Sequence, residues 1–105
     1  MIKLRQIVKD AFKCDELVYQ FERIDVEDGI ICKGIAFPTH DDVIAAVNAE
    51  FSDAYILGEA ANRLDISRCN IEDGRHDPTG EDMKVHKREF RQLSNFINKH
   101  RKAAA

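Results

Sequence analysis

The chain has 105 residues, of which 44% are hydrophobic and 33% charged, and its formal net charge at pH 7 is −3. This length suits one domain with a single core, and the composition excludes wholesale disorder. No apolar run approaches the roughly 20 residues that cross a bilayer, and the opening MIKLRQIVKD lacks the apolar segment of a signal peptide. We therefore expect a cytoplasmic protein with no membrane contact.

Charge is distributed unevenly along the chain. Residues 1–55 hold six Lys/Arg against eleven Asp/Glu, whereas residues 84–102 hold seven basic residues against one acidic residue. A polyanion would therefore meet the C-terminal part first, while the acidic half suits a basic protein partner.

The chemistry-bearing residues do not form a recognisable catalytic or metal motif. Three widely spaced cysteines (Cys14, Cys32 and Cys69) are typical of reduced thiols rather than of a disulfide framework. Cys69, His76 and His86 form the nearest metal-ligand set, but they match no common zinc spacing. No nucleophile with an adjacent base and no phosphate-binding Gly loop is present. We expect no enzyme activity, no metal and no cofactor.

The N-terminal half predicts a helix followed by a β-hairpin. Leu4, Ile7, Val8 and Ala11 lie on one face of an amphipathic helix over Ile2–Lys13. From Leu17 the apolar period changes to two, which predicts a strand. Glu27-Asp28-Gly29 supplies turn residues, and Ile30–Phe37 would return as the second strand.

A second helix is expected after Pro38. Thr39 and Asp42 resemble a capping box, and carboxylates in the first turn suit the helix dipole. One apolar stripe then carries the helix to about Phe51: Val43, Ile44, Val47 and Phe51.

Residues 56–75 have the pattern of two short helices joined by a turn. The apolar residues of the first helix recur at three- and four-residue intervals: Leu57, Ala60, Ala61 and Leu64. Asp65 tolerates a left-handed backbone and can turn the chain, and Ser67 is a good N-cap for a second helix that Gly74 ends. The corner would be packed by Ala61, Ile66 and Ile71. The pattern predicts a helix-turn-helix.

The line GEAANRLDISRCNI also resembles the helix-turn-helix of small phage excisionases and mercury-regulator-type repressors, with Asp65 where those families carry Gly. The resemblance covers about twenty residues and implies a DNA-binding protein that regulates transcription or recombination. Glu72 and Asp73, within the second helix and at its end, oppose phosphate binding.

The last predicted element is a long basic helix over Met83–Lys102. One side of it carries Phe90, Leu93, Phe96, Ile97 and His100. We therefore expect an α+β fold in one domain over residues 1–102. Residues 1–52 would form an α-β-β-α half and residues 53–102 a helix-turn-helix-like half. The final AAA, residues 103–105, is typical of a vector-derived tail.

Two functions fit these features. In the first, the chain is a small DNA-binding regulator of phage or mobile-element type, with the N-terminal half as core or homodimer platform. Its DNA contacts would be Ser67, Arg68, Asn70, Arg75, Lys84, Lys87 and Arg88. In the second, it is a non-enzymatic inhibitor or adaptor that docks through its acidic half on a larger nucleic-acid-handling complex. Its partner contacts would be Asp41, Asp42 and Glu50.

Overall fold

The computed structural model describes residues 3–73 and 80–104, without the side chains of Asp82 and of residues 102–104. Within these ranges the chain is helical and contains no strand. Its elements are α1 (Gln6–Ala11), α2 (Asp15–Tyr19), the π-helical segment η1 (Gln20–Asp25), α3 (His40–Glu50), α4 (Asp53–Glu72) and α5 (Glu81–Ala104). None of the helices in these ranges combines the length and apolar character needed to cross a bilayer.

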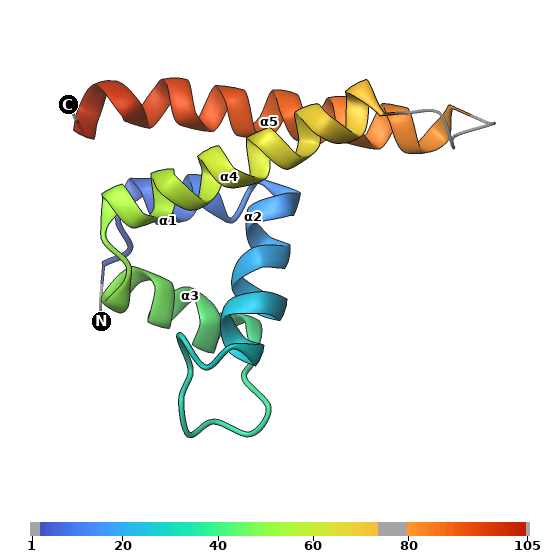
Figure 1. Ribbon diagram of the computed structural model, residues 1–105. Helices are drawn as coiled ribbons and strands as arrows, with labels where there is room; N and C mark the ends of the chain where they lie inside the picture. The colour runs from blue at the N-terminus through green and yellow to red at the C-terminus, as the bar shows by residue number, and fades with distance from the viewer. Residues whose placement is uncertain (1–2, 74–79, 105) are drawn as a thin grey trace.

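The helices form a flat, L-shaped assembly with extents of 46 × 35 × 19 Å (Figure 1). Helices α4 and α5 run antiparallel along one edge, and α1 lies beside α4. The α2–η1 segment descends from this pair to α3, and a loop over residues 28–39 extends beyond α3 at the far end. The loop and the outer side of α5 therefore lie at opposite edges of the molecule.

The core is apolar and draws on every helix. Its largest fully buried apolar side chains are Leu17, Phe21, Ile31, Ile56 and Leu93. Phe21 packs between Phe12 and Phe51, with ring centroids 5.4 and 5.9 Å apart. Because small helical domains are stabilised mainly by packing of apolar faces, this cluster holds the short helices α1 and α2 in place.

The predicted β-hairpin is wrong, and with it the α+β fold class. Residues 15–25 form α2 and η1, in which Leu17, Phe21 and Asp25 are buried at four-residue spacing, while Tyr19 is 52% exposed. Residues 30–37 form no strand, because Cys32 and Gly34 adopt positive φ angles of 59° and 85°. Those angles are incompatible with an extended chain.

The predicted helix-turn-helix is also wrong, because α4 continues without a break from Asp53 to Glu72. Asp65 lies inside this helix, and Ala61 and Ile66, which would have packed the corner, are exposed. Residues 65–67 contain neither Gly nor Pro, and α4 packs along α5 through this region (Figure 1). Packing against α5 therefore stabilises helix where local sequence allowed a turn.

We expect Ile66→Pro to destabilise the protein by about 3 kcal/mol, because proline inside a helix removes one backbone hydrogen bond and clashes with the preceding turn. Urea denaturation followed by circular dichroism measures the change. Ile66→Ala is the matched control and should have a much smaller effect. If the two variants were equally stable, the chain would turn at this position.

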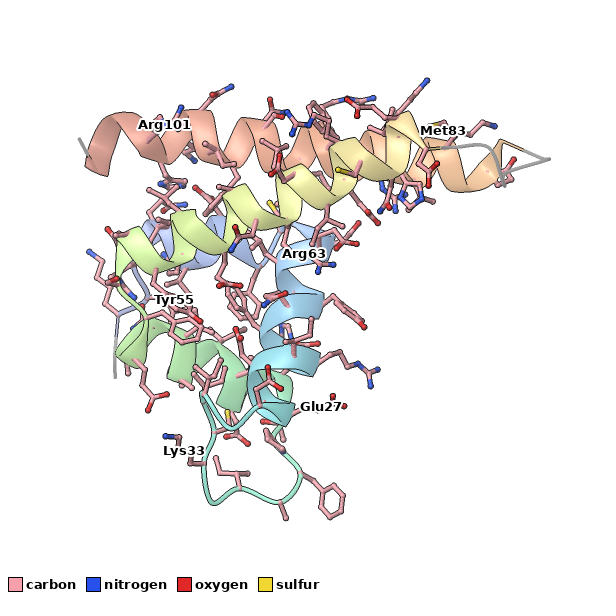
Figure 2. All side chains as sticks on the ribbon, viewed as in Figure 1. Glu27, Lys33, Tyr55, Arg63, Met83 and Arg101 are labelled. Atoms are coloured by element: carbon pink, nitrogen blue, oxygen red, sulfur yellow. The ribbon has the colours of Figure 1, made fainter. Side chains whose placement is uncertain are left out.

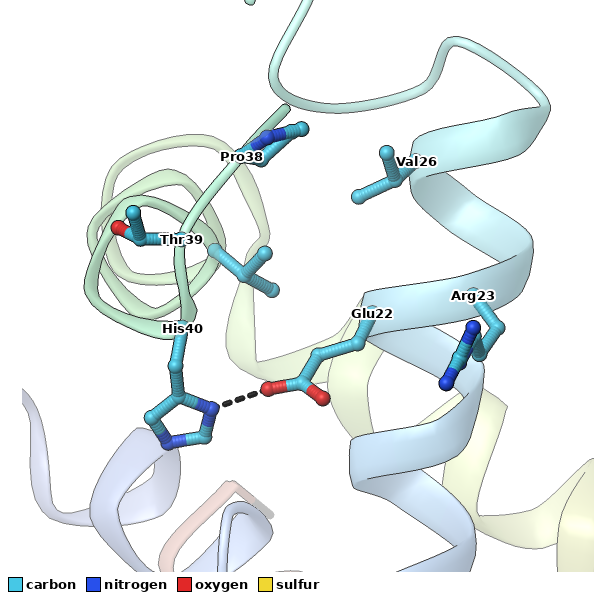
Figure 3. Close-up of a pocket in the computed structure, with 7 residues that line it drawn as sticks. Glu22, Arg23, Val26, Pro38, Thr39 and His40 are labelled. Atoms are coloured by element: carbon cyan, nitrogen blue, oxygen red, sulfur yellow. Dashed lines mark hydrogen bonds and ion pairs between the residues drawn. The ribbon is translucent and has the colours of Figure 1, made fainter. Parts of the chain in front are cut away.

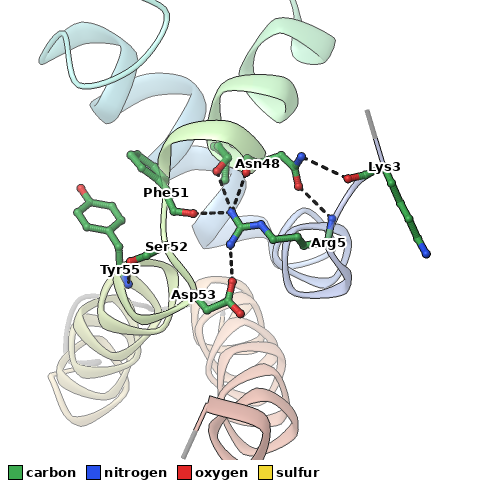
Figure 4. Close-up of polar contacts among 8 residues, drawn as sticks. Lys3, Arg5, Asn48, Phe51, Ser52, Asp53 and Tyr55 are labelled. Atoms are coloured by element: carbon green, nitrogen blue, oxygen red, sulfur yellow. Dashed lines mark hydrogen bonds and ion pairs between the residues drawn. The ribbon is translucent and has the colours of Figure 1, made fainter. Parts of the chain in front are cut away.

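Arg5 fastens the N-terminal segment to the joint between α3 and α4 (Figure 4). Its guanidinium donates to the backbone oxygens of Asn48, at 2.9 Å, and Phe51, and pairs with Asp53. The last carbonyls of a helix have no hydrogen-bond donor within the helix, so Arg5 supplies donors to carbonyl groups at the C-terminal end of α3. Ser52 caps α4 by accepting a hydrogen bond from the Tyr55 N–H at 3.1 Å.

Candidate docking surface

The 28–39 loop is anchored at both ends, although it contains no regular secondary structure. At its start, the Ile30 N–H donates to the Asp25 carbonyl at 2.9 Å, and Ile31 is inserted into the core with 1% exposure. At its end, the Thr39 N–H donates to Asp42 Oδ2 at 2.9 Å within the capping box of α3. The loop is therefore held in one position relative to α3.

This anchored loop exposes large apolar side chains. Phe37 is 91% exposed, and Ile30 and Ile35 are 42% and 45% exposed. Single exposed apolar residues are ordinary, but several on one short anchored segment mark an interaction surface. Burial of Ile31 in the core stabilises the loop. The exposed side chains of Ile30, Ile35 and Phe37 are therefore available to contact another molecule.

A groove of about 430 Å³ lies between the loop and α3. Its α3 side presents three small residues, Ala45, Ala46 and Ala49, with the carboxylates of Asp42 and Glu50 toward its two ends. Its loop side is formed by Cys32, Lys33 and Ile35. Figure 2 shows Lys33 extending from the loop. Asp42 and Glu50 are eight residues apart, or about 12 Å along a helix.

Cys32, on the groove side of the loop, has a strained backbone conformation. Its φ of 59° is uncommon for a residue with a side chain, and its thiol lies 3.7 Å from the Asp42 carbonyl as a weak donor. Burial, together with the nearby Asp42 and Glu50 carboxylates, raises the pKa of this thiol. Cys32 is therefore a protonated, structural group here rather than a nucleophile.

A second hollow, of about 340 Å³, lies on the η1 side of the loop (Figure 3). Val26 and Pro38 line it, and the His40 ring pairs with Glu22 across it. The His40 ring also packs edge-on against Phe12, with centroids 5.5 Å apart. Its other lining residues are Arg23, Val43 and Thr39, and the Thr39 hydroxyl is engaged in capping α3.

Two of the three acidic residues predicted for partner binding lie together in the groove. Asp42 and Glu50 line it, and Asp41 is exposed on α3 without lining it. Asp42 also caps the helix, so it has a structural role as well. Sequence reasoning missed Ile35 and Phe37 because it assigned them to the second strand of a hairpin. The signal for a loop was Gly29 before this segment and Gly34 within it, and both adopt positive φ angles in the structure.

The residues predicted for DNA contact are divided between two helices. On α4, Ser67 is 1% exposed, Asn70 is exposed, and Arg68 is exposed but paired with Asp65 at 2.6 Å. On α5, three predicted cations are all exposed: Lys84, Lys87 and Arg88. Arg75 lies outside the described residues. At the end of α4, Ser67 is buried, whereas the acidic residues Glu72 and Asp73 are exposed and oppose binding of phosphates.

In the described part of the chain, no three His, Cys, Asp or Glu side chains converge to hold a metal ion. The candidate surface is therefore defined by its shape, its exposed apolar side chains and its charge. Comparison of the chain with known protein families, curated proteins and solved structures found no match in any of the three.

Proposed function

We propose that this protein is a non-enzymatic protein-binding module, and that the 28–39 loop together with α3 forms its docking face. The observation that carries the proposal is the exposure of Ile35 and Phe37 on an anchored loop beside an open groove. Aromatic side chains dominate interface energetics when a partner covers them.

The partner that fits the groove is an amphipathic helix. The floor of the groove is one face of α3, and its alanines allow another helix to approach closely. A peptide that binds by strand addition would need a free strand edge, and residues 3–73 and 80–104 contain no strand. Ile35, which lines the groove, would cover one flank of the docked helix, and Phe37, two residues further along the loop, would extend this apolar contact beyond the groove.

The charge of the groove favours a cationic partner. Asp42 and Glu50 lie on the α3 side, and Lys33 is the cation among the lining residues. Lys or Arg side chains at the margins of the partner's apolar stripe would pair with the two carboxylates. A second copy of the chain fits poorly, because Val85 is the one exposed large apolar side chain among the described residues of α5 and forms no apolar stripe with the exposed cations. We therefore assign the groove to a different protein.

Selection from a displayed library of random peptides of about 16 residues tests the proposal, since such a peptide forms a helix long enough to fill the groove. We expect binders enriched in Lys and Arg, with apolar residues at three- and four-residue spacing. Their affinity should fall at least tenfold for Ala49→Arg and for Phe37→Ser.

The matched control is Ala61→Arg, because Ala61 is also an exposed helix alanine but lies on α4, away from the groove. This variant should retain the selected peptides. Peptides rich in Asp and Glu, or peptides that bind Ala49→Arg as well as the unmodified protein, would contradict the proposed docking face.

A further inference from the structure

Helix α5 has two chemically different sides. The side toward the core buries Leu93, Phe96, Ile97 and His100. At 3.6 residues per turn, the opposite side carries Lys84, Lys87, Arg88, Arg91, Asn95 and Asn98. All six of these residues are exposed. They extend over about 21 Å of helix, and Figure 2 shows Met83 and Arg101 near the two ends of this helix.

The cations on this outer side are available to a ligand. Lys87 and Arg91 form no ion pair with any residue in the described ranges. Lys84 and Arg88 pair with Glu81 and Asp15 at 3.5 Å, but all four side chains are more than half exposed. Exposed pairs of this kind contribute little, so both cations can exchange their partner for a phosphate.

We propose that the outer side of α5 is a binding site for the phosphate backbone of nucleic acid, independent of the docking face at the other edge of the molecule. Four cations within two turns give a positive stripe, and the two asparagines extend it with amide donors. The stripe carries no aromatic side chain for base stacking, so it recognises backbone and not sequence.

A membrane surface fits the same helix less well. Basic helices that lie on lipid insert an apolar face between the headgroups. The apolar side chains of α5, Leu93, Phe96 and Ile97, are already buried in the protein core. Val85, 37% exposed, is a single apolar side chain and gives no face to insert into lipid, so the exposed side of α5 is mainly polar and charged, which suits a rigid row of phosphates.

Fluorescence anisotropy with a labelled DNA duplex of about 20 base pairs tests this site, starting at about 20 mM salt, where weak backbone contacts are detectable. We expect the logarithm of the affinity to fall with the logarithm of salt concentration with a slope of about −3, as for three to four neutralised phosphates. The triple variant Lys84→Ala, Lys87→Ala, Arg91→Ala should bind at least tenfold more weakly and lose most of that slope.

A second triple variant, Lys3→Ala, Lys9→Ala, Arg23→Ala, removes the same charge from exposed positions outside α5 and should change binding less than threefold. Lys84→Arg, Lys87→Arg should retain binding, because the charge is kept. Absent duplex binding at low salt, equal losses in the two triple variants, or tighter binding to phosphatidylserine vesicles than to the duplex would each overturn the assignment.

Discussion

We expect Phe21→Ala and Phe37→Ala to differ in their effect on the free energy of unfolding by about 3 kcal/mol or more. Phe21 is fully buried between Phe12 and Phe51, so its truncation leaves a cavity in the core. Such cavities cost about 3–5 kcal/mol for phenylalanine. Phe37 is 91% exposed, and its truncation should change stability by no more than about 0.5 kcal/mol.

Urea denaturation of both variants measures this difference directly. The midpoint should fall sharply for Phe21→Ala with little change in slope, and it should stay near that of the unmodified protein for Phe37→Ala. A loss of more than about 1 kcal/mol in Phe37→Ala would mean that this ring packs on the protein itself and is unavailable for docking.

The second large effect concerns the buried Asp10 carboxylate and the polar side chains around it, which join α1 to α5. The Asp10 carboxylate, 8% exposed, accepts from His100 Nε2 at 2.7 Å, Lys99 Nζ at 2.8 Å and Gln6 Nε2 at 3.0 Å. Replacing Asp10 with Asn would leave the nearly buried His100 ring and Lys99 facing an uncharged amide. Lys99 is 59% exposed and can turn to water, so the main loss is the hydrogen bond from His100 to a charged acceptor, which costs about 2 kcal/mol. Asp15→Asn, an exposed carboxylate, is the control.

The same cluster makes stability depend on pH. Burial alone would raise the pKa of Asp10, but the hydrogen bonds from Lys99, His100 and Gln6 outweigh burial and lower it to about 2. A carboxyl whose pKa is lower in the folded state stabilises the fold above its unfolded pKa, 3.8, and this contribution is lost as pH falls toward 2. It amounts to about 2 kcal/mol.

Denaturation at pH 6 and at pH 3 distinguishes the contribution of Asp10 to stability from the contributions of the other titrating groups. The destabilisation caused by Asp10→Asn should be smaller at pH 3. At that pH the Asp10 carboxyl of the unfolded chain, with a pKa of 3.8, is mostly protonated, while that of the folded protein, with a pKa of about 2, is still ionised. The effect of Asp15→Asn should be near zero at both values. An Asp10→Asn effect that is the same at both pH values would contradict a charged Asp10 in the folded protein.

The two errors in the fold predicted from the sequence have the same physical origin. Where the local residue pattern fits two conformations, packing against residues distant in the sequence decides which one forms. The alternation of Leu17, Tyr19 and Phe21 fits a strand, but Leu17 and Phe21 are also four residues apart and share a helical face. Asp65 permits a turn without requiring one. In both segments the competing conformations are close in local free energy, and contacts with α4 or α5 select the helix.

Where local chemistry is decisive, the predictions are confirmed. The capping box of Thr39 and Asp42 is present, and α3 begins at His40. Of the predicted face of α5, Leu93, Phe96, Ile97 and His100 are buried and Phe90 is half-buried. Caps and strong 3.6-residue periodicity depend on neighbouring residues, so they can be read from one sequence.

The candidate site was predictable only in part. The acidic pattern singled out Asp42 and Glu50, which line the groove, and the basic run singled out Lys84, Lys87 and Arg88, which share one side of α5. The apolar half of the docking face was not predictable, because Ile35 and Phe37 resemble core residues by type. Their exposure follows from the anchoring of the loop at Ile31 and Asp42.

The most direct test of the docking face is a titration of isotope-labelled protein with a helical peptide whose leucine stripe is flanked by lysines, followed by NMR chemical shifts. We predict that the perturbed amides lie in residues 30–50, and that the same peptide with glutamate in place of lysine binds at least tenfold more weakly. Perturbations centred on α5, or equal binding of the two peptides, would contradict the assignment of the 28–39 loop and α3 as a face for a cationic helix.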